Sequence, residues 1–504
     1  MGNNVVINYS QSGLGTPATG EDFISGLLIY SSVYPSGFSD ASQIHEIFSV
    51  TDAEALGITN TSIGETKASG TITITASGAT SAVITAIVKT TVFGTVTLGT
   101  YTVLATDTLT TIATGLAAAI NTNTAVHGFT ASPSGAIVTV TAPAQTGVGG
   151  NSFTFANTYT LGATATSSTF SGGVASTIDP MHYHIAQYFN NNPTGDLFVM
   201  VTTGTSATFS YSEITTLVNA SNGKIRQMGL YEQIAFNTTN LAKLQTQALA
   251  NETNNKPLEL FYGADFSAVS DLTTLTDLST LNAQNVSVMF GQDGGNTALG
   301  GGYRLWLATN KSMTCLGAFL GAVSSAPVNE SVAWVGKYNM DSVEFDTLAF
   351  ANGTSYALQS DGLLNNIDAK AYTFLKKYVG IAGSYFNNDT TAIAATSVYN
   401  SVHLNRTIHK AARSVRGQLL PSVASPIYFN ADGTIALYSI THFQDQAKIA
   451  LANMVSNGEI SQYAVIINAK QNVLATKNLV ITIEIVPVGV ANKITINLGF
   501  TLSI

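Results

Sequence analysis

Charged side chains are scarce in this chain. They make up 10% of its 504 residues, against about 25% in ordinary soluble domains. The net charge of −9 is modest and no basic tract is present, so the sequence carries no electrostatic signal for nucleic-acid binding. A surface rich in hydroxyl and amide groups suits a protein that is largely covered by neighbouring subunits. It fits a β-rich extracellular or viral protein equally well.

Cysteine is nearly absent. The one thiol, Cys315, excludes an internal disulfide framework and a multi-cysteine metal site. Its apolar surroundings predict a buried, inert group. The first residues, MGNNVVINYSQSG, lack the basic start and apolar core of a signal peptide, and no run of about 18 apolar residues indicates a membrane span. We therefore expect assembly in a cytoplasm, without stable membrane insertion.

Motifs of catalysis and cofactor binding are also missing. His182 and His184 form an H-x-H pair that could offer two metal ligands, but no cysteine or third histidine lies near them in the sequence. The loop 291–296 follows a predicted strand, yet it lacks both the P-loop and the G-x-G-x-x-G spacing. No G-x-S-x-G elbow occurs. We expect no enzyme activity, no catalytic residue, no cofactor and no metal.

The most informative feature that is present is the segment 479–504, which reads as two long strands. Twelve residues at about 3.3 Å each give the last strand a length of roughly 40 Å. Such an apolar strand needs a partner sheet, so we interpret it as an inter-subunit strand and expect function by assembly. Its apolar face consists of Ile494, Ile496, Leu498, Phe500, Leu502 and Ile504.

Composition and periodicity divide the chain into segments of an α/β and α+β multidomain protein. Between residues 68 and 178 only Lys89 and Asp107 are charged, and threonine-rich alternating runs predict strands around a single helix from Leu109 to Ile120. Strands and helices alternate from about 180 to 325, which predicts a mostly parallel sheet. The expected segments are an extended arm (1–22), the first part of a core (23–66), an inserted β-rich domain (67–177), an α/β middle domain (178–330), a C-terminal domain (331–478) and a strand arm (479–504).

Within that plan we expect strands at 23–30, 197–202, 228–231, 258–262 and 286–290. Helices are expected at 42–48, 212–222, 239–253, 272–283 and 303–320. A further helix is predicted around 398–419, where Pro421 stops it. Three of the five arginines of the chain lie in this helix. Its apolar stripe is predicted to consist of Leu404, Ile408, Ala411, Val415 and Leu419. On the opposite side we expect a basic surface that meets an acidic partner, made of Arg406, Lys410, Arg413 and Arg416.

The chain resembles the contractile tail sheath proteins of tailed phages and related injection machines. The resemblance rests on the order of several patterns, over roughly 23–60 and 180–504. They are FISGLLIYSSVYPSGFSDASQIHEIFSV, HYHIAQYFNNNPTGDLFVMV, NRTIHKAARSVRGQLLPSVASPI, HFQDQAKIALANMVSNGEISQYAVI and LVITIEIVPVGVANKITINLGF. The inserted 67–177 region lies where sheath proteins commonly carry variable outward-facing domains.

The resemblance implies a mechanism. Sheath subunits form stacked rings around a tail tube, and their terminal strands complete sheets of neighbouring subunits. A baseplate signal then lets the sheath contract, which drives the tube through a membrane. The implied partners are further copies of the chain, the tail tube protein, and the baseplate and tail terminator proteins, in a virion tail assembled in a bacterial host. Under this interpretation the basic helix is the candidate tube-facing surface.

Two other interpretations remain open from the sequence. A tail fibre or surface adhesin would explain the threonine- and glycine-rich insertion, although the alternating region from 197 to 320 argues against a fibre. An α/β enzyme that uses the loop at 291–302 would need a phosphate or metal site that the sequence does not show.

Overall fold

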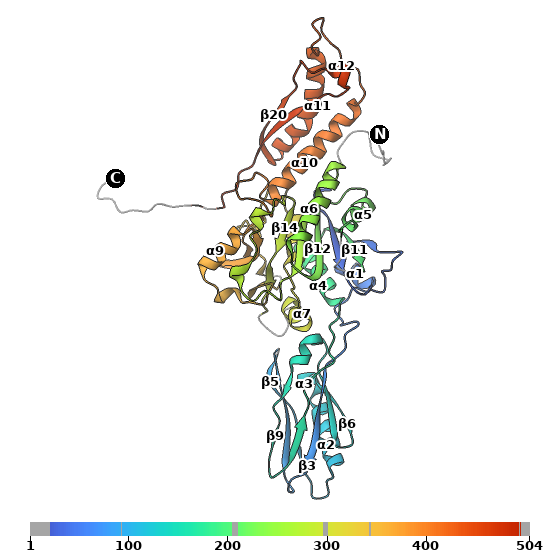
Figure 1. Ribbon diagram of the computed structural model, residues 1–504, viewed down its shortest axis with the longest axis vertical. Helices are drawn as coiled ribbons and strands as arrows, with labels where there is room; N and C mark the ends of the chain where they lie inside the picture. Colours follow the sequence, from blue (N-terminus) through green and yellow to red (C-terminus); the bar gives the residue numbers. More distant parts are fainter. Residues whose placement is uncertain are drawn as a thin grey trace, which may run out of the picture. The chain divides into compact units, whose positions relative to one another are not determined.

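The computed structural model describes residues 21–91, 93–203, 210–295, 301–341, 344–492 and 494. The chain forms two compact units (Figure 1). The larger unit holds residues 23–325 and 332–400, and the smaller unit holds residue 22 together with 326–331 and the C-terminal part from 401 onward. Both units contain helices and strands, in agreement with the mixed α and β character expected from the sequence.

A seven-stranded sheet in the order β17-β14-β13-β12-β1-β11-β2 forms the centre of the larger unit. Its neighbours are parallel except for β11 and β2. All residues of β1 and β13 are buried, as in parallel sheets that are covered on both faces. The strands are β1 (Ile24–Tyr30), β2 (Ile44–Ile47), β11 (Asp196–Thr202), β12 (Gln227–Ala235), β13 (Glu259–Asp265), β14 (Val286–Met289) and β17 (Tyr372–Thr373).

Helices of this unit connect and cover the strands. Two of them, α4 and α8, pack closely because α8 presents glycines to α4. A Cβ on Gly317 would lie 2.1 Å from the carbonyl oxygen of His184, and one on Gly321 would lie 2.4 Å from that of Tyr188. The helices are α1 (Val50–Ala55), α4 (Asp179–Asn191), α5 (Glu213–Ala220), α6 (Thr238–Thr253), α7 (Gly301–Thr309), α8 (Leu316–Ser325) and α9 (Asp361–Ala369).

Three predicted helices differ in the structure. The segment 42–48 contains strand β2, which pairs with β11. The segment 272–283 forms two short 3-10 turns, because the side chains of Asp271 and Asp277 accept hydrogen bonds from Thr273 and Ser279 and compete with a continuous helix. The segment 303–320 is interrupted between α7 and α8, where the Met313 N–H donates to Gln292 at 2.7 Å.

The inserted region has a hydrophobic core of its own, between residues 68 and 170. One sheet has the order β10-β3-β7-β6, and the other joins β5, β4 and β8, with β9 also on β4. Helix α2 (Leu109–Thr122) begins at a Thr108 capping box, and α3 (Thr124–His127) follows it. The strands are β3 (Ser69–Ala76), β4 (Val83–Thr90), β5 (Gly94–Thr102), β6 (Thr130–Ser134), β7 (Ile137–Thr141), β8 (Thr154–Phe155), β9 (Thr158–Tyr159) and β10 (Thr164–Ser167).

The outward face of the sheet β10-β3-β7-β6 carries hydroxyl groups. On β3, Ile72 and Ile74 are buried, so that Thr71 and Thr73 point outward. Thr71 pairs with Thr139 of β7. The edge strand β6 contains Pro133, which has no backbone N–H to offer a further strand.

Short antiparallel pairs complete the larger unit. β15 (Gly291–Asp293) pairs with β16 (Leu348–Phe350), and β18 (Leu375–Tyr378) pairs with β19 (Ile381–Phe386). The loop at 291–296, a candidate phosphate site in the sequence, thus begins with strand β15. Residues 296–300 lie outside the described part of the chain.

Candidate functional site in the C-terminal unit

Two antiparallel helices and a strand pair make up the smaller unit. In Figure 1 helices α10 (Val402–Leu419) and α11 (Leu437–Ser456) lie side by side. Their shared core includes Ala411, Val415, Ala447, Leu451 and Met454. Small residues at 411 and 447 let the two helices approach, because alanine adds little bulk between their backbones. The helix predicted around 398–419 is therefore confirmed.

Strands β20 (Ile460–Ile466) and β21 (Thr482–Pro487) form an antiparallel sheet. Ile481, Ile483 and Ile485 pack against the helical core, whereas Val486 on the other face is 54% exposed. In the described part of the chain this sheet has two strands. Each strand therefore has one edge without a partner strand there, and such an edge is a template for pairing with another chain.

The predicted inter-subunit strand lies almost wholly beyond these elements. Ile494 is described and is 79% exposed. Ile496, Leu498, Phe500 and Leu502 lie outside the described residues. The first of the two predicted strands is confirmed in part, since β21 covers Thr482–Pro487.

The basic helix face differs from the exposed surface expected from the sequence. Arg406 is buried, with 4% of its surface exposed. Its guanidinium donates to the backbone carbonyls of Asp22 and Ala326, each at 3.2 Å. A buried arginine with carbonyl partners holds its own chain together, so Arg406 is not part of a free charged surface.

Lys410 and Arg413 are engaged as well. Lys410 Nζ lies 2.6 Å from Asp22 and 2.5 Å from Glu459, and Arg413 lies 2.7 Å from Asp22. Burial alone would raise the pKa of Asp22, but Lys410 and Arg413 hold it below its usual value. We call Asp22, Arg406, Lys410, Arg413 and Glu459 the Asp22 cluster. Of the four predicted basic residues, Arg416 is exposed.

The apolar stripe predicted for this helix is also displaced at its start. Ala411 and Val415 are buried as expected, but Ile408 is 36% exposed. His403, Asn405 and Thr407 are buried in its place. Periodicity predicted the helix correctly but not which face of its first two turns is buried. Polar side chains are buried there because they make hydrogen bonds, such as that of Thr407 to the Val328 carbonyl.

An apolar hollow of about 510 Å³ opens beside the strand pair. It lies between the end of α10, the start of β21 and the short helix α12 (Val473–Thr476). Leu474 on its rim is 73% exposed. Apolar side chains dominate its lining, among them Leu419, Ile427, Phe429, Phe443, Leu479 and Ile481.

In the larger unit β11 and β12 lie on opposite sides of β1. Ligands of open α/β sheets bind where neighbouring strands diverge in this way, beyond the carboxyl ends of the strands. The possible ligand site of this sheet is therefore at the carboxyl ends of β1 and β12. Buried side chains fill this position. Glu232 is 1% exposed and accepts from Tyr211 at 3.1 Å and also from Tyr262. Burial raises the pKa of Glu232, and the two tyrosine hydroxyls lower it in part. The carboxyl is thus bonded within the protein.

The two residues of the histidine pair have different surroundings. Both residues lie on α4; His182 Nε2 is 3.0 Å from Glu54, and burial lowers the pKa of His184 to about 3. Among the described residues no group of three histidine, cysteine, aspartate or glutamate side chains is placed to hold a metal. Cys315 is buried, and burial raises its pKa to about 12. No described helix has the length and apolar character needed to cross a membrane.

Solved structures with some likeness to this chain come from contractile machines. A chain of the anti-feeding prophage baseplate is 11% identical, with a TM-score of 0.42, over 64% of this chain and 80% of that chain. A chain of the PVC sheath in its contracted state is 11% identical, with a TM-score of 0.40, over 64% and 81%. A sheath tail protein from Listeria innocua is 10% identical, with a TM-score of 0.36, over 95% and 96%.

No curated protein matches the chain. The C-terminal domain of the DUF2586 family matches residues 399–504, which contain the helices and strands of the smaller unit. The N-terminal domain of the same family matches residues 136–390, half of the chain. The chain belongs to the DUF2586 family.

Proposed function

We propose that this protein is a structural subunit of a contractile tail sheath, which polymerises around a tail tube and contracts to drive the tube through a membrane. The observation that carries the proposal is the strand pair β20–β21. Helices α10 and α11 pack against one face of this sheet. In the described part of the chain its two outer edges have no partner strand. Edges of this kind accept strands from neighbouring subunits through main-chain hydrogen bonds.

The chain also supplies a strand of the right character. Residues 493–504 alternate between apolar and polar side chains and follow β21 after a short connection. Alternation fixes which face of a donated strand meets the acceptor's core. Because one chain carries both a strand to donate and a sheet edge to accept one, each copy can link to the next. A polymer of identical subunits requires this.

Under this proposal the protein acts without catalysis, consuming no nucleotide or cofactor. Its partners are further copies in stacked rings, a tail tube protein, and baseplate and terminator proteins, in a tail assembled in a bacterial host. The whole basic face of α10 cannot contact the tube, because three of its four basic side chains, Arg406, Lys410 and Arg413, bind groups of the Asp22 cluster. Arg416 is the exposed one.

Negative-stain microscopy tests the proposal. The purified full-length chain should form tubes or stacked rings. A variant with 493–504 replaced by an equally long Gly/Ser segment should remain as soluble single subunits with unchanged circular dichroism. Tubes from the replaced chain would contradict strand donation, and discrete small particles from the full-length chain would contradict the sheath.

The hydroxyl-bearing sheet face of the inserted region favours a second candidate, a surface adhesin. Thr71, Thr73, Thr139 and Thr141 lie on neighbouring strands of that face, and hydroxyl groups both donate and accept hydrogen bonds. Deletion of 67–177 separates the candidates. A sheath subunit would still polymerise without it, whereas an adhesin would lose its binding to cells.

A further inference from the structure

The apolar hollow of about 510 Å³ lies beyond the start of β21. Two of its lining residues, Leu479 and Ile481, lead directly into that strand, which begins at Thr482. Ile427 and Phe429 form another part of the wall, from the connection between α10 and α11. The volume is in the range of about 300–1,000 Å³ that is typical of binding pockets. The hollow therefore has room for apolar side chains of another segment.

The strand predicted at 493–504 is longer than the edge of β21. It has twelve residues, whereas β21 has six. Since β20 and β21 are antiparallel, a strand added to β21 in the same manner runs from Pro487 towards Thr482. Residues 493–498 then lie along β21, and 499–504 continue for roughly 20 Å past Thr482. The hollow lies at that end of β21.

The second half of this segment carries side chains that suit the hollow. Phe500, Leu502 and Ile504 share one face of an extended strand. Phe500 is the one aromatic residue between 493 and 504, and aromatic rings bury a large apolar area. Gly499 stands where the segment leaves β21, and a glycine in a strand permits a bend or a close backbone approach. The half that extends past β21 thus matches the apolar lining.

The segment 493–504 can come from the same chain or from another copy, and residues 1–20 are a further alternative. Ile494 is 79% exposed, which disfavours pairing of the segment with β21 of its own chain. In residues 1–20, Val5, Ile7 and Tyr9 share one face, and polar residues and glycine follow them. Three inward side chains match the six residues of β21 and leave none for the hollow. The observations therefore favour residues 493–504 of another copy.

We propose that the hollow binds Phe500 and Leu502 of a second copy of this chain, whose residues 493–498 extend the sheet at β21. Main-chain hydrogen bonds along β21 supply affinity, and the hollow selects the side chains that follow. A buried aromatic side chain in a pocket is the kind of contact that dominates the energy of an interface. The inference rests on the proposed strand donation and adds the acceptor edge, the direction of the strand and the side chains that are recognised.

Binding of a synthetic peptide tests the proposal without polymerisation. The acceptor is the full-length chain with 493–504 replaced by a Gly/Ser segment, and the probe is a fluorescein-labelled peptide with the sequence of 493–504. We expect saturable binding in fluorescence anisotropy, and at least about tenfold weaker binding of the Phe500→Ala peptide. The Thr501→Ala peptide, changed on the opposite face, should bind like the parent.

Three results of this titration would overturn the proposal. They are the lack of saturable binding, equal affinities of the parent and the Phe500→Ala peptide, and tighter binding of a peptide with the sequence of 1–20. The last result would assign the hollow to the other end of the chain.

A charge on the rim locates the site. Leu474 lines the hollow and is 73% exposed, so Leu474→Asp should fold normally, as circular dichroism can check. We expect it to weaken peptide binding by about tenfold or more, because apolar side chains of the peptide then meet a charge. Leu437→Asp is the matched control, since Leu437 is 75% exposed in the same unit and lies outside the lining. Equal affinities of the two variants would overturn the assignment.

Cross-linking in the assembled polymer distinguishes this inference from the sheath function. Leu474→Cys combined with Leu502→Cys should form disulfides between copies on oxidation, seen as a ladder of chain multiples in a non-reducing gel. Leu474→Cys combined with Ser503→Cys, on the opposite face, should not. Cys315 is 1% exposed and does not compete.

Each outcome of the cross-linking has a separate meaning. Tubes with the ladder support the proposal. Tubes without it would overturn the binding of Leu502 in the hollow and leave the sheath function standing, and a disulfide within one chain would overturn the role of a second copy. If the unmodified chain forms no tubes, the sheath proposal fails, and the peptide titration still decides what the hollow binds.

Discussion

Arg413 donates to the carboxylate of Asp22 at 2.7 Å, across 391 positions of the sequence. Lys410 pairs with the same carboxylate, and Arg406 binds its backbone carbonyl. Asp22, which belongs to the same compact unit as α10 although it is far from that helix in the sequence, is thus fixed to α10. Two of the three arginines of this helix therefore bind groups within the same unit rather than face a partner.

We expect Asp22→Asn to lower the free energy of unfolding by about 1–3 kcal/mol, because it leaves Lys410 and Arg413 without their shared carboxylate. Urea denaturation measures this, and Asp445→Asn, whose pair with Lys448 is exposed, is the control with little effect. Since the pKa of Asp22 is lowered in the folded protein, its contribution is present above the unfolded pKa and is lost as pH falls through the folded pKa. Equal stability of the variant and the parent at pH 7 would contradict the cluster's role.

The contribution of Asp293 to stability should change with pH in the opposite direction to that of Asp22. Burial raises its pKa to about 7, although the Gly295 N–H lowers it in part. The folded protein therefore holds this proton more tightly than the unfolded chain, so its contribution to stability is present at low pH and is lost as pH rises from about 4 to 7. Asp293→Asn should remove that part of the slope when unfolding is followed across this range. An unchanged slope would show that Asp293 ionises normally.

Tyr262→Phe removes one donor to the buried Glu232 carboxylate. We expect a loss of about 1–3 kcal/mol in the free energy of unfolding, because a buried acceptor loses a bond that water cannot replace. Tyr428→Phe, at an exposed position, is the matched control. A loss no larger than that of the control would contradict a stabilising role for this hydrogen bond.

Val486→Lys places a charge on the exposed face of β21, which is an edge strand in the described part of the chain. Charged side chains on edge strands oppose pairing with further strands. We expect a change in subunit stability within about 0.5 kcal/mol and a clear loss of polymer in sedimentation. Val398→Lys, at an exposed loop position of the larger unit, should leave assembly intact, and equal assembly by both variants would contradict pairing at β21.

The sequence pattern was sufficient where an element has one apolar face or is apolar along its whole length. The strands β1, β11, β12, β13 and β14 and the helices α5, α6 and α10 all lie where the sequence predicts them. It failed at Ile44–Ile47, because four residues with apolar ends fit a strand or a helical turn equally well. At 272–283 leucines recur every third residue, and the two aspartate-capped turns use that spacing.

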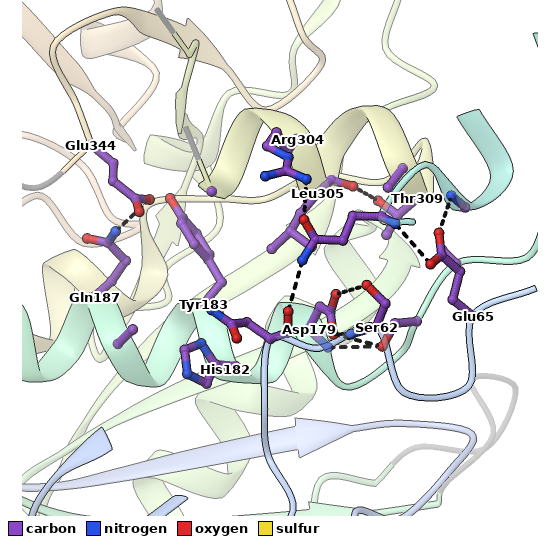
Figure 2. A pocket seen from close by; sticks show the side chains of 18 residues that line it. Ser62, Glu65, Asp179, His182, Tyr183, Gln187, Arg304, Leu305, Thr309 and Glu344 are labelled. Atoms are coloured by element: carbon purple, nitrogen blue, oxygen red, sulfur yellow. Dashed lines mark hydrogen bonds between the residues drawn. The ribbon is translucent and has the colours of Figure 1, made fainter. Parts of the chain in front are cut away.

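The polar sites were harder to predict for a different reason. The Asp22 cluster joins residues from positions 22 to 459, and charge counting along a helix cannot reveal a partner so distant in sequence. A cavity of about 220 Å³ between α4 and α7 is similar, since its lining residues Tyr183, Arg304 and Glu344 carry no motif (Figure 2). Its walls come from segments far apart in the sequence, which meet only once the chain is folded.

Pro133 has a further consequence if copies of the chain associate through strands as proposed. The inserted region contains two threonine-rich sheets whose edges could join those of other copies, which would cross-link particles at random. A missing N–H on β6 closes one such route. Under the proposed assembly through the strand pair of the C-terminal unit, the closed edge on β6 reduces the joining of separate assemblies through the inserted region.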